Sequence, residues 1–170
     1  GATRVTLEHG SIDCNAVIVA VDGGLDVLLP ELSGRVRTAR LQMLASAPTR
    51  EVDLTRPVYA RYGYEYYQQL PSGEVALGGF RDVAGEGEWT NDRLPGSTVQ
   101  VLLEDYLRER VGVTAPVTHR WAASVGYSSG LLPLFTTTRG GVIACGGYNG
   151  TGNLVGALVG RGAAQVALAG

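Results

Sequence analysis

The sequence predicts an α+β protein built on a largely antiparallel sheet, with about three helices and a Gly-rich strand–loop–helix segment near the C-terminus. Three observations support this fold class. Several short apolar segments alternate with polar residues at the period of a strand, turn residues separate them, and only a few stretches have helical periodicity. The 170 residues are 45% hydrophobic, which is enough to build one domain with a core.

The order of elements follows from these patterns. They predict a hairpin (3–7 and 12–21), a short helix (25–29), a half-exposed strand (36–44), a Tyr-rich strand (57–70) with a hairpin partner (75–80), a surface loop (81–95), a helix (97–111), two strands (116–127 and 131–138), and a last strand (142–144) followed by a helix from about Asn153.

In the first hairpin, His9 and Gly10 supply the turn. The returning arm contains the unbroken apolar run AVIVAV (16–21), which is typical of a strand covered on both faces. In the strand 36–44, by contrast, the polar residues Arg37, Arg40 and Gln42 alternate with apolar ones. We therefore expect one face of that strand to be exposed.

The middle of the chain contains a second hairpin and an amphipathic helix. The sequence Pro71-Ser72-Gly73 is typical of a tight turn between the Tyr-rich strand and its partner. Residues 81–95 are acidic and aperiodic, so they predict a surface loop. Ser97 and Gln100 have the spacing of a capping box, and the helix that they open ends before Gly112.

The segment GVIACGGYNGTGNLVGA (141–157) is the most informative in the chain. It predicts a short strand, a glycine-rich turn and the start of a helix. Glycines leave backbone N–H groups open to approach, and a helix N-terminus favours an electron-rich oxygen or ring edge. A tight turn that binds nothing gives the same pattern. Gly156 and Gly160 lie about one turn apart and would allow another backbone to come close.

Composition excludes several classes of function. A net charge of −2 gives no electrostatic support for binding nucleic acid or an anionic membrane. No apolar run reaches the roughly 18 residues of a membrane span, and no leader pattern is present. Cys14 and Cys145 have no second Cys or His at metal-ligand spacing, so we expect free thiols, no metal site and a reducing, cytoplasmic location.

Four segments resemble the D-amino-acid-oxidase-like FAD-dependent oxidoreductases, a family that includes glycine and sarcosine oxidases and γ-glutamylputrescine oxidoreductases. GVIACGGYNGTGNLVGA (141–157) is similar to their C-terminal flavin-contacting segment, and AVIVAVDG (16–23) to the strand that returns to the FAD domain. YEYYQQLPSGEVALGGFRD (64–82) is similar to their substrate-domain hairpin. THRWAASVGYSSGLLPLF (118–135) is similar to the strand before the next flavin contact.

The resemblance covers nearly the whole chain and implies a single domain with two kinds of element. Residues 1–35 and 139–170 resemble parts of an FAD domain, and residues 36–138 resemble a substrate domain. Members hold the FAD pyrophosphate with an N-terminal Gly-x-Gly-x-x-Gly turn, which nothing in this sequence matches. FAD is therefore expected if a partner chain supplies the pyrophosphate site, and otherwise no cofactor is expected.

Two positions depart from the family pattern. Many members carry Asp-Gly before a Leu-Pro pair, where this chain has Gly130-Leu131. At Val125, glycine-oxidase-like members often place an arginine that holds the substrate carboxylate, which a valine cannot do. The departures favour an amine substrate, or an unrelated one, over a free α-amino acid.

The candidate cofactor-binding residues come from the resemblance, in which the Gly-rich segment wraps the isoalloxazine ring and its backbone donors stabilise charge on the reduced flavin. They are Gly147, Tyr148, Asn149, Gly150, Thr151, Gly152 and Asn153. Thr151 and Asn153 are also ordinary helix N-cap residues, a role that needs no ligand.

Tyrosines supply the first candidates for a substrate pocket. Alternation along 57–70 predicts that Tyr62, Tyr64 and Tyr66 share one side of a strand and form an aromatic wall. Tyrosine also favours half-buried strands where nothing binds. We assign Tyr62 and Tyr66 to substrate binding and Tyr64 to catalysis.

The other candidates lie on neighbouring strands. His119 is a candidate general acid or base, because an unperturbed histidine has a pKa of about 6.5. A lone strand histidine is also often a hydrogen-bonded structural residue. Trp121, on the same face, is a candidate for substrate contact or for the core. Arg81 is a candidate for a substrate anion or for an ion pair with Asp82.

Two enzymatic functions remain open at this point, beside a non-catalytic binding or scaffold protein built on the same sheet. The first is a substrate-domain half or subunit of a flavin-dependent amine or amino-acid oxidoreductase, which oxidises a C–N bond to an imine. It requires a partner chain with the missing FAD domain, and such a half would hide an apolar face. The second is a cofactor-independent descendant that acts on a small molecule as an isomerase, cyclase or lyase, either alone or as a homo-oligomer.

Overall fold

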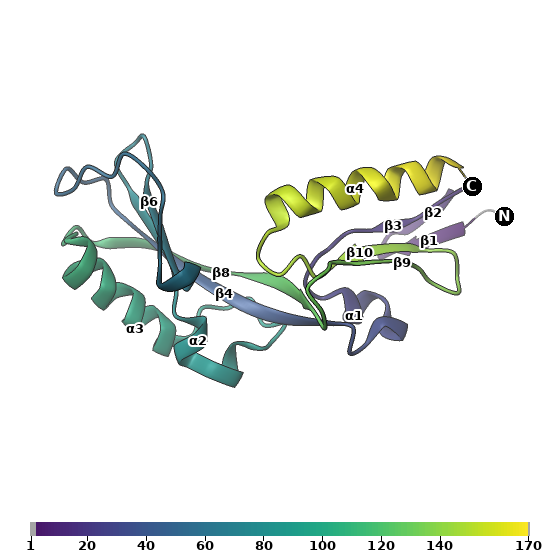
Figure 1. Ribbon diagram of the computed structural model, residues 1–170, viewed down its shortest axis with the longest axis horizontal. Coiled ribbons are helices and arrows are strands. Elements are labelled where there is room, and N and C mark those ends of the chain that lie inside the picture. The colour runs from purple at the N-terminus through teal and green to yellow at the C-terminus, as the bar shows by residue number, and fades with distance from the viewer. Residues whose placement is uncertain (1–2, 170) are drawn as a thin grey trace. The chain divides into compact units, whose positions relative to one another are not determined.

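The computed structural model describes residues 3–169 and confirms the α+β class (Figure 1). The strands are β1 (Thr3–Leu7), β2 (Gly10–Cys14), β3 (Ile18–Val19), β4 (Val36–Ser46), β5 (Val58–Ala60), β6 (Glu65–Gln69), β7 (Val75–Gly79), β8 (Val117–Ser128), β9 (Leu134–Thr137) and β10 (Ile143–Gly146). The α-helices are α1 (Leu25–Leu28), α2 (Arg81–Ala84), α3 (Ser97–Tyr106) and α4 (Gly152–Ala169). Shorter helical turns cover Pro30–Leu32, Arg61–Gly63, Gly85–Glu88 and Leu107–Val111.

The chain divides into two compact units, one with the described residues up to Ala39 and from Val125 onward, the other with Arg40–Ser124. β4 and β8 each contain residues of both units. The assignment of residues 1–35 and 139–170 to FAD-domain-like elements, and of residues 36–138 to a substrate-domain-like part, stays a prediction.

The first unit contains a β1–β2 hairpin and a three-stranded sheet in the order β3-β10-β9. β3 runs parallel to β10, and β9 runs antiparallel to it. α4 packs on one side of β10, where Ala163 meets Ile143 and Cys145. A second cluster packs around Ala144 and contains Leu25 from α1. The central strand of this sheet is therefore covered by two apolar clusters.

The returning arm of the first hairpin differs from its prediction. It breaks after β2, and only Ile18–Val19 pair again, as an edge strand beside β10. Ile18 and Val21 are exposed within the described residues. The expectation of a strand covered on both faces is wrong for this unit, because an edge strand has one neighbour and the Ile18 and Val21 side chains stay exposed.

The second unit contains an antiparallel sheet in the order β5-β6-β7-β4-β8, with α3 on one face. Leu103 of α3 is fully buried against Leu44, Val75 and Leu77 of the sheet. Helical spacing predicted this helix correctly, down to its end at Gly112, which adopts the left-handed conformation that glycine tolerates.

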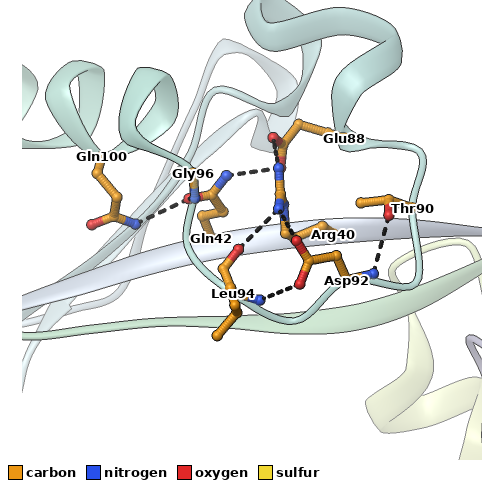
Figure 2. Close-up of polar contacts among 8 residues, drawn as sticks. All are labelled: Arg40, Gln42, Glu88, Thr90, Asp92, Leu94, Gly96 and Gln100. Carbon is orange, nitrogen blue, oxygen red and sulfur yellow. Dashed lines mark hydrogen bonds and ion pairs between the residues drawn. The ribbon is translucent and has the colours of Figure 1, made fainter.

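β4 is longer and more buried than predicted, because its polar side chains are paired inside the unit. Figure 2 shows the Arg40 guanidinium donating two hydrogen bonds to Glu88, at 2.7 and 3.0 Å, and others to Asp92 and the Leu94 carbonyl. Gln42 donates to Glu88 at 2.9 Å. Arg40 and Gln42 are thus not on an exposed face.

The same contacts correct the prediction of a surface loop over residues 81–95. This segment begins with α2 and a further helical turn, and Glu88 is buried. Burial raises the pKa of the Glu88 carboxyl, but the hydrogen bonds from Arg40 and Gln42 more than offset that effect, so its net pKa lies below the usual value. The segment is held by a buried ion pair.

The predicted capping box is also wrong. α3 begins at Ser97 after Gly96, and no side chain caps its N-terminus. Instead, the Gly96 N–H and the Gln100 side chain both donate to the Gln42 side-chain oxygen, at 2.8 and 3.3 Å (Figure 2). A long-range partner takes the place of the local cap.

Glu51 connects two loops of the second unit. Its carboxylate accepts hydrogen bonds from the backbone N–H groups of Thr114 and Ala115, at 2.9 and 3.1 Å. The Thr114 hydroxyl and the Thr49 hydroxyl also donate to it. The hydrogen bond from the Thr114 side chain, together with those from the two backbone amides and Thr49, lowers the pKa of Glu51 to about 2.

We predict that Glu51→Gln lowers the melting temperature at neutral pH. Because the folded-state pKa lies below the ordinary value, the stabilisation by Glu51 is complete above about pH 4.5 and is lost as the pH falls through about 2. Melting curves of both proteins should therefore converge between these pH values. Asp53→Asn, which removes an exposed carboxylate nearby, is the control, and a difference that is independent of pH would contradict the assignment.

Candidate functional site

Asp22 holds the Gly-rich loop in place. It lies between β3 and α1, and one of its carboxylate oxygens accepts a hydrogen bond from the Tyr148 N–H at 2.9 Å. The other accepts from the Gly126 N–H at 3.0 Å. One carboxylate therefore joins three segments that are far apart in sequence.

The backbone of Asp22 is equally constrained. Its φ of 58° lies in the left-handed region, and its carbonyl oxygen lies against two glycines. A Cβ atom at Gly126 would lie 2.5 Å from this oxygen, and one at Gly146 would lie 2.8 Å from it. The Asp-Gly-Gly sequence at 22–24, directly after the apolar run 16–21, is the one local signal of this role.

Asn149 stabilises the loop through hydrogen bonds to β8. Its φ is 55°, its N–H donates to the Gly126 carbonyl at 3.0 Å, and its side-chain oxygen accepts from the Ser128 N–H at 2.9 Å. Its amide nitrogen donates to the Ser128 hydroxyl at 3.1 Å. The side chain thus folds back on β8, a structural role for a residue predicted to contact cofactor.

Gly147 and Tyr148 are the buried part of the predicted cofactor segment. A Cβ atom at Gly147 would lie 3.1 Å from both the Ser128 nitrogen and the Val36 side chain. Burial and a hydrogen bond to Cys145 raise the pKa of Tyr148 well above its usual range. The Tyr148 ring lies under Gly156, so that glycine accommodates an aromatic ring where we had expected another backbone.

The outer part of the loop is open. Gly150, Thr151 and Asn153 are exposed and Gly152 is half-buried. The Thr151 hydroxyl donates to the Tyr148 carbonyl at 2.7 Å, so it shapes the turn and does not cap the helix. α4 begins at Gly152, and the first N–H groups of a helix have no partner within it. These donors suit an electron-rich ligand edge.

A second candidate surface is the face of the five-stranded sheet opposite α3. Tyr67 points to the α3 side, where its ring lies 6.2 Å from that of Tyr106, so Tyr66 points to the other side. On that side, a row of paired residues crosses four strands. Tyr66 of β6 pairs with Tyr59 of β5 on one side and with Gly78 of β7 on the other. Gly78 in turn pairs with Met43.

His119 and Trp121 lie on the same open face. Arg120, between them on β8, donates to the side chains of Gln100 and Glu104 of α3, so its two neighbours point away from α3. Both are exposed, and the His119 Nδ1 atom lies 2.9 Å from the Thr118 hydroxyl. The second unit thus places Tyr66, His119 and Trp121 on one face of one sheet.

The other two predicted tyrosines do not join this face by alternation, because the Tyr-rich strand is not continuous. A turn at Arg61–Gly63 separates β5 from β6, and Arg61, Tyr62 and Gly63 all have positive φ. Tyr62 is fully exposed at the tip, with a relative exposure of 106%. The prediction that Tyr62, Tyr64 and Tyr66 share one side of a strand is therefore wrong.

Ion pairs hold this turn. Arg61 donates to both oxygens of the fully buried Glu65 and to Asp82. Its guanidinium carbon lies 5.8 Å from the centre of the Tyr64 ring. Asp82 is thus paired with Arg61, and Arg81, the candidate anion contact, lies 5.1 Å from the Trp89 ring.

The comparisons with known proteins identify the family. The sequence pattern described as FAD dependent oxidoreductase matches residues 1–166, and the chain belongs to this family. No curated protein sequence matches the chain. Within residues 3–169, no cluster of three or more His, Cys, Asp or Glu side chains is suited to a metal ion, and no helix is both long and apolar enough to span a bilayer.

Solved structures share the fold. Glycine oxidase from Bacillus cereus ATCC 14579 has a TM-score of 0.73 at 16% identity, over 95% of this chain and 45% of that one. Iminodiacetate oxidase from Chelativorans sp. BNC1 gives 0.71 at 17%, over 91% and 42%. L-proline dehydrogenase from P. horikoshii gives 0.68 at 15%, over 92% and 43%. The chain spans less than half the length of each of these proteins.

We predict that Asp22→Asn loosens the Gly-rich loop. Asparagine tolerates the left-handed backbone, but its NH₂ group would face one of the two N–H donors. The loss should be about 1–3 kcal/mol of unfolding free energy, with faster hydrogen exchange at Tyr148 or Gly126. Asp105→Asn, on the exposed side of α3, is the control. Unchanged protection at both amides would contradict this role.

Gly78→Ala tests whether the Tyr66 ring lies over Gly78 on the open face of the sheet. A Cβ atom there would lie 2.5 Å from the Tyr66 ring and 2.8 Å from the Met43 side chain, so the ring must move. We expect a loss of about 1–3 kcal/mol in urea denaturation, because such contacts overpack the site. Gly87→Ala, where a Cβ atom would meet nothing within 4 Å, is the control. Equal stability of the two variants would show that Tyr66 does not lie over Gly78.

Proposed function

We propose that this chain is the substrate-domain half of a flavin-dependent amine or amino-acid oxidoreductase. The observation that carries the proposal is the open outer part of the Gly-rich loop, which the half-buried Asp22 carboxylate holds at the N-terminus of an 18-residue helix. Family membership over residues 1–166 supports FAD as the cofactor.

The residues present fit one end of FAD. The turn at Gly150–Asn153 opens α4, and the first N–H groups of a helix, which have no partner within it, suit the electron-rich edge of a flat heterocycle. By contrast, the sequence has no Gly-x-Gly-x-x-Gly turn for the pyrophosphate. We therefore propose that a dinucleotide-binding half, joined to this chain or separate, supplies the rest of the cofactor site.

The chemistry of the bound cofactor would be to accept a hydride from the carbon beside the substrate nitrogen, which yields an imine that hydrolyses. The proposed role of this chain is to bind and orient the amine. Tyr66 on β6 and Trp121 on β8 offer aromatic surface on the same face of the sheet, with β7 and β4 between them, and His119, two residues from Trp121, is exposed for proton transfer. Tyr62, Tyr64 and Arg81 remain proposed substrate or catalytic residues on the neighbouring turns.

Val125 makes an amine a better substrate than a free α-amino acid, because a valine offers no cation for a carboxylate. Cys14 and Cys145 are free thiols, which supports a reducing compartment and hence our proposal of a cytoplasmic protein.

Flavin absorption tests this function. The chain is co-expressed with the proposed dinucleotide-binding half, which would carry the Gly-x-Gly-x-x-Gly turn. We then expect a yellow complex that loses its colour when an amine is added in the absence of oxygen. Asn153→Asp, which adds a negative charge beside the proposed donors, should weaken affinity for reduced FAD about tenfold.

Asn91→Asp, an exposed Asn-to-Asp change in the second unit, is the matched control for that variant and should leave FAD affinity unchanged. A colourless complex that ignores added FAD would contradict the oxidoreductase proposal and favour a cofactor-independent isomerase, cyclase or lyase.

A further inference from the structure

The second unit contains a cavity at one end of its five-stranded sheet. It lies between the loop that follows β4 and the tight turn that joins β6 to β7, and its volume is about 440 Å³. The described residues that line it are Pro48, Thr49, Arg50, Pro71, Ser72 and Gly73. None of them belongs to the Gly-rich loop or to the open face of the sheet. A cavity of this size can hold a small organic molecule.

Hydrogen bonds between the two loops fix the walls of this cavity. The Thr49 N–H donates to the Gly73 carbonyl at 3.0 Å. The Gln69 side-chain amide donates to both the Thr49 and the Gly73 carbonyl, at 3.1 and 3.2 Å. A Cβ atom at Gly73, whose φ is 104°, would lie 3.4 Å from the Pro48 side chain. The loops are therefore held together before any ligand binds, which lowers the cost of ordering the site.

Arg50 is the single charged residue among the described residues of the lining. It is exposed, and within residues 3–169 it makes no hydrogen bond or ion pair. The carboxylates next to these loops have other partners: Glu51 accepts the four hydrogen bonds described above, and Glu74 accepts one from the Ser72 hydroxyl. The donors of the Arg50 guanidinium are therefore available to an anion from solution.

The same two carboxylates limit the charge of that anion. Glu51 and Glu74 are each next in sequence to a lining residue, so every further negative charge on a ligand is repelled. One guanidinium neutralises one charge, and its planar fork fits the two oxygens of a carboxylate. The rings of Pro48 and Pro71 add apolar surface to the walls. The lining thus suits a monoanion with an apolar body better than a phosphate dianion.

We propose that this cavity binds a small organic monocarboxylate, with its carboxylate on Arg50 and its apolar body against Pro48 and Pro71. The proposal does not rest on the flavin-dependent function, because the cavity lies wholly in the second unit and the Gly-rich loop lies in the first. It gives the chain a binding site that the oxidation of an amine does not require.

The test compares a charged probe, 2-naphthoate, with its neutral counterpart 2-naphthamide. Each is titrated into the full chain at neutral pH, and binding is followed by NMR at the backbone amides of Thr49, Arg50, Ser72 and Gly73. We expect naphthoate to bind with a dissociation constant on the order of 1 mM. It should bind at least about fivefold more tightly than naphthamide, and added salt should reduce this preference.

Arg50→Gln should abolish the preference, so that naphthoate then binds no more tightly than naphthamide. Arg50→Lys keeps the charge but loses the planar fork, and it should retain part of the preference. Arg56→Gln is the matched control, because Arg56 is also exposed and does not line the cavity. Since Arg50 has no partner within the described residues, its replacement should leave the melting temperature unchanged.

Four results would overturn the proposal. Naphthoate and naphthamide bind equally well; Arg56→Gln weakens naphthoate as much as Arg50→Gln does; the amides that shift lie outside the cavity; or 2-naphthyl phosphate binds more tightly than naphthoate. Flavin binding by a complex with the dinucleotide-binding half affects none of these measurements, so the two proposals can fail separately.

Discussion

The first unit depends on one carboxylate. Asp22 holds the N–H groups of Gly126 and Tyr148, while its own carbonyl lies against Gly126 and Gly146 with no space for a Cβ atom. These contacts fix where β10 ends and how the chain turns into α4. The outward direction of Gly150–Asn153 is therefore a consequence of packing that lies beneath the loop, and not of the exposed residues themselves.

The glycines of this chain have two different uses that composition alone does not separate. At Gly126, Gly146 and Gly78, a neighbouring carbonyl or ring occupies the space of the missing Cβ. At Gly150, the left-handed φ of 83° and exposure keep the backbone open. In the Gly-rich segment 141–157, some glycines are thus needed for close packing. Only the outer half of the loop is suited to contact a ligand.

Periodicity predicted the α+β class, α3, the β6–β7 hairpin and the strand–loop–helix at the C-terminus, because each is encoded by residues close in sequence. The failures have non-local causes. β4 is buried because Arg40 meets Glu88, 48 residues away, and no alternation pattern reveals that pair. The Tyr-rich strand breaks at Arg61 and Tyr62, two residues that rarely adopt positive φ, because Arg61 pairs with the buried Glu65 and with the exposed Asp82.

α4 connects the two incomplete features of the first unit. Its N-terminus follows the exposed turn of the loop, and its outer face carries the exposed Leu154, Leu158 and Leu168, so both belong to one helix. If a ligand binds at the helix N-terminus and another element covers the exposed leucines, each orders the same helix, and each should then strengthen the binding of the other. Such coupling is reciprocal by thermodynamic necessity. Contacts made by the exposed leucines would in that case affect ligand binding at the helix N-terminus, although the leucines do not touch the ligand.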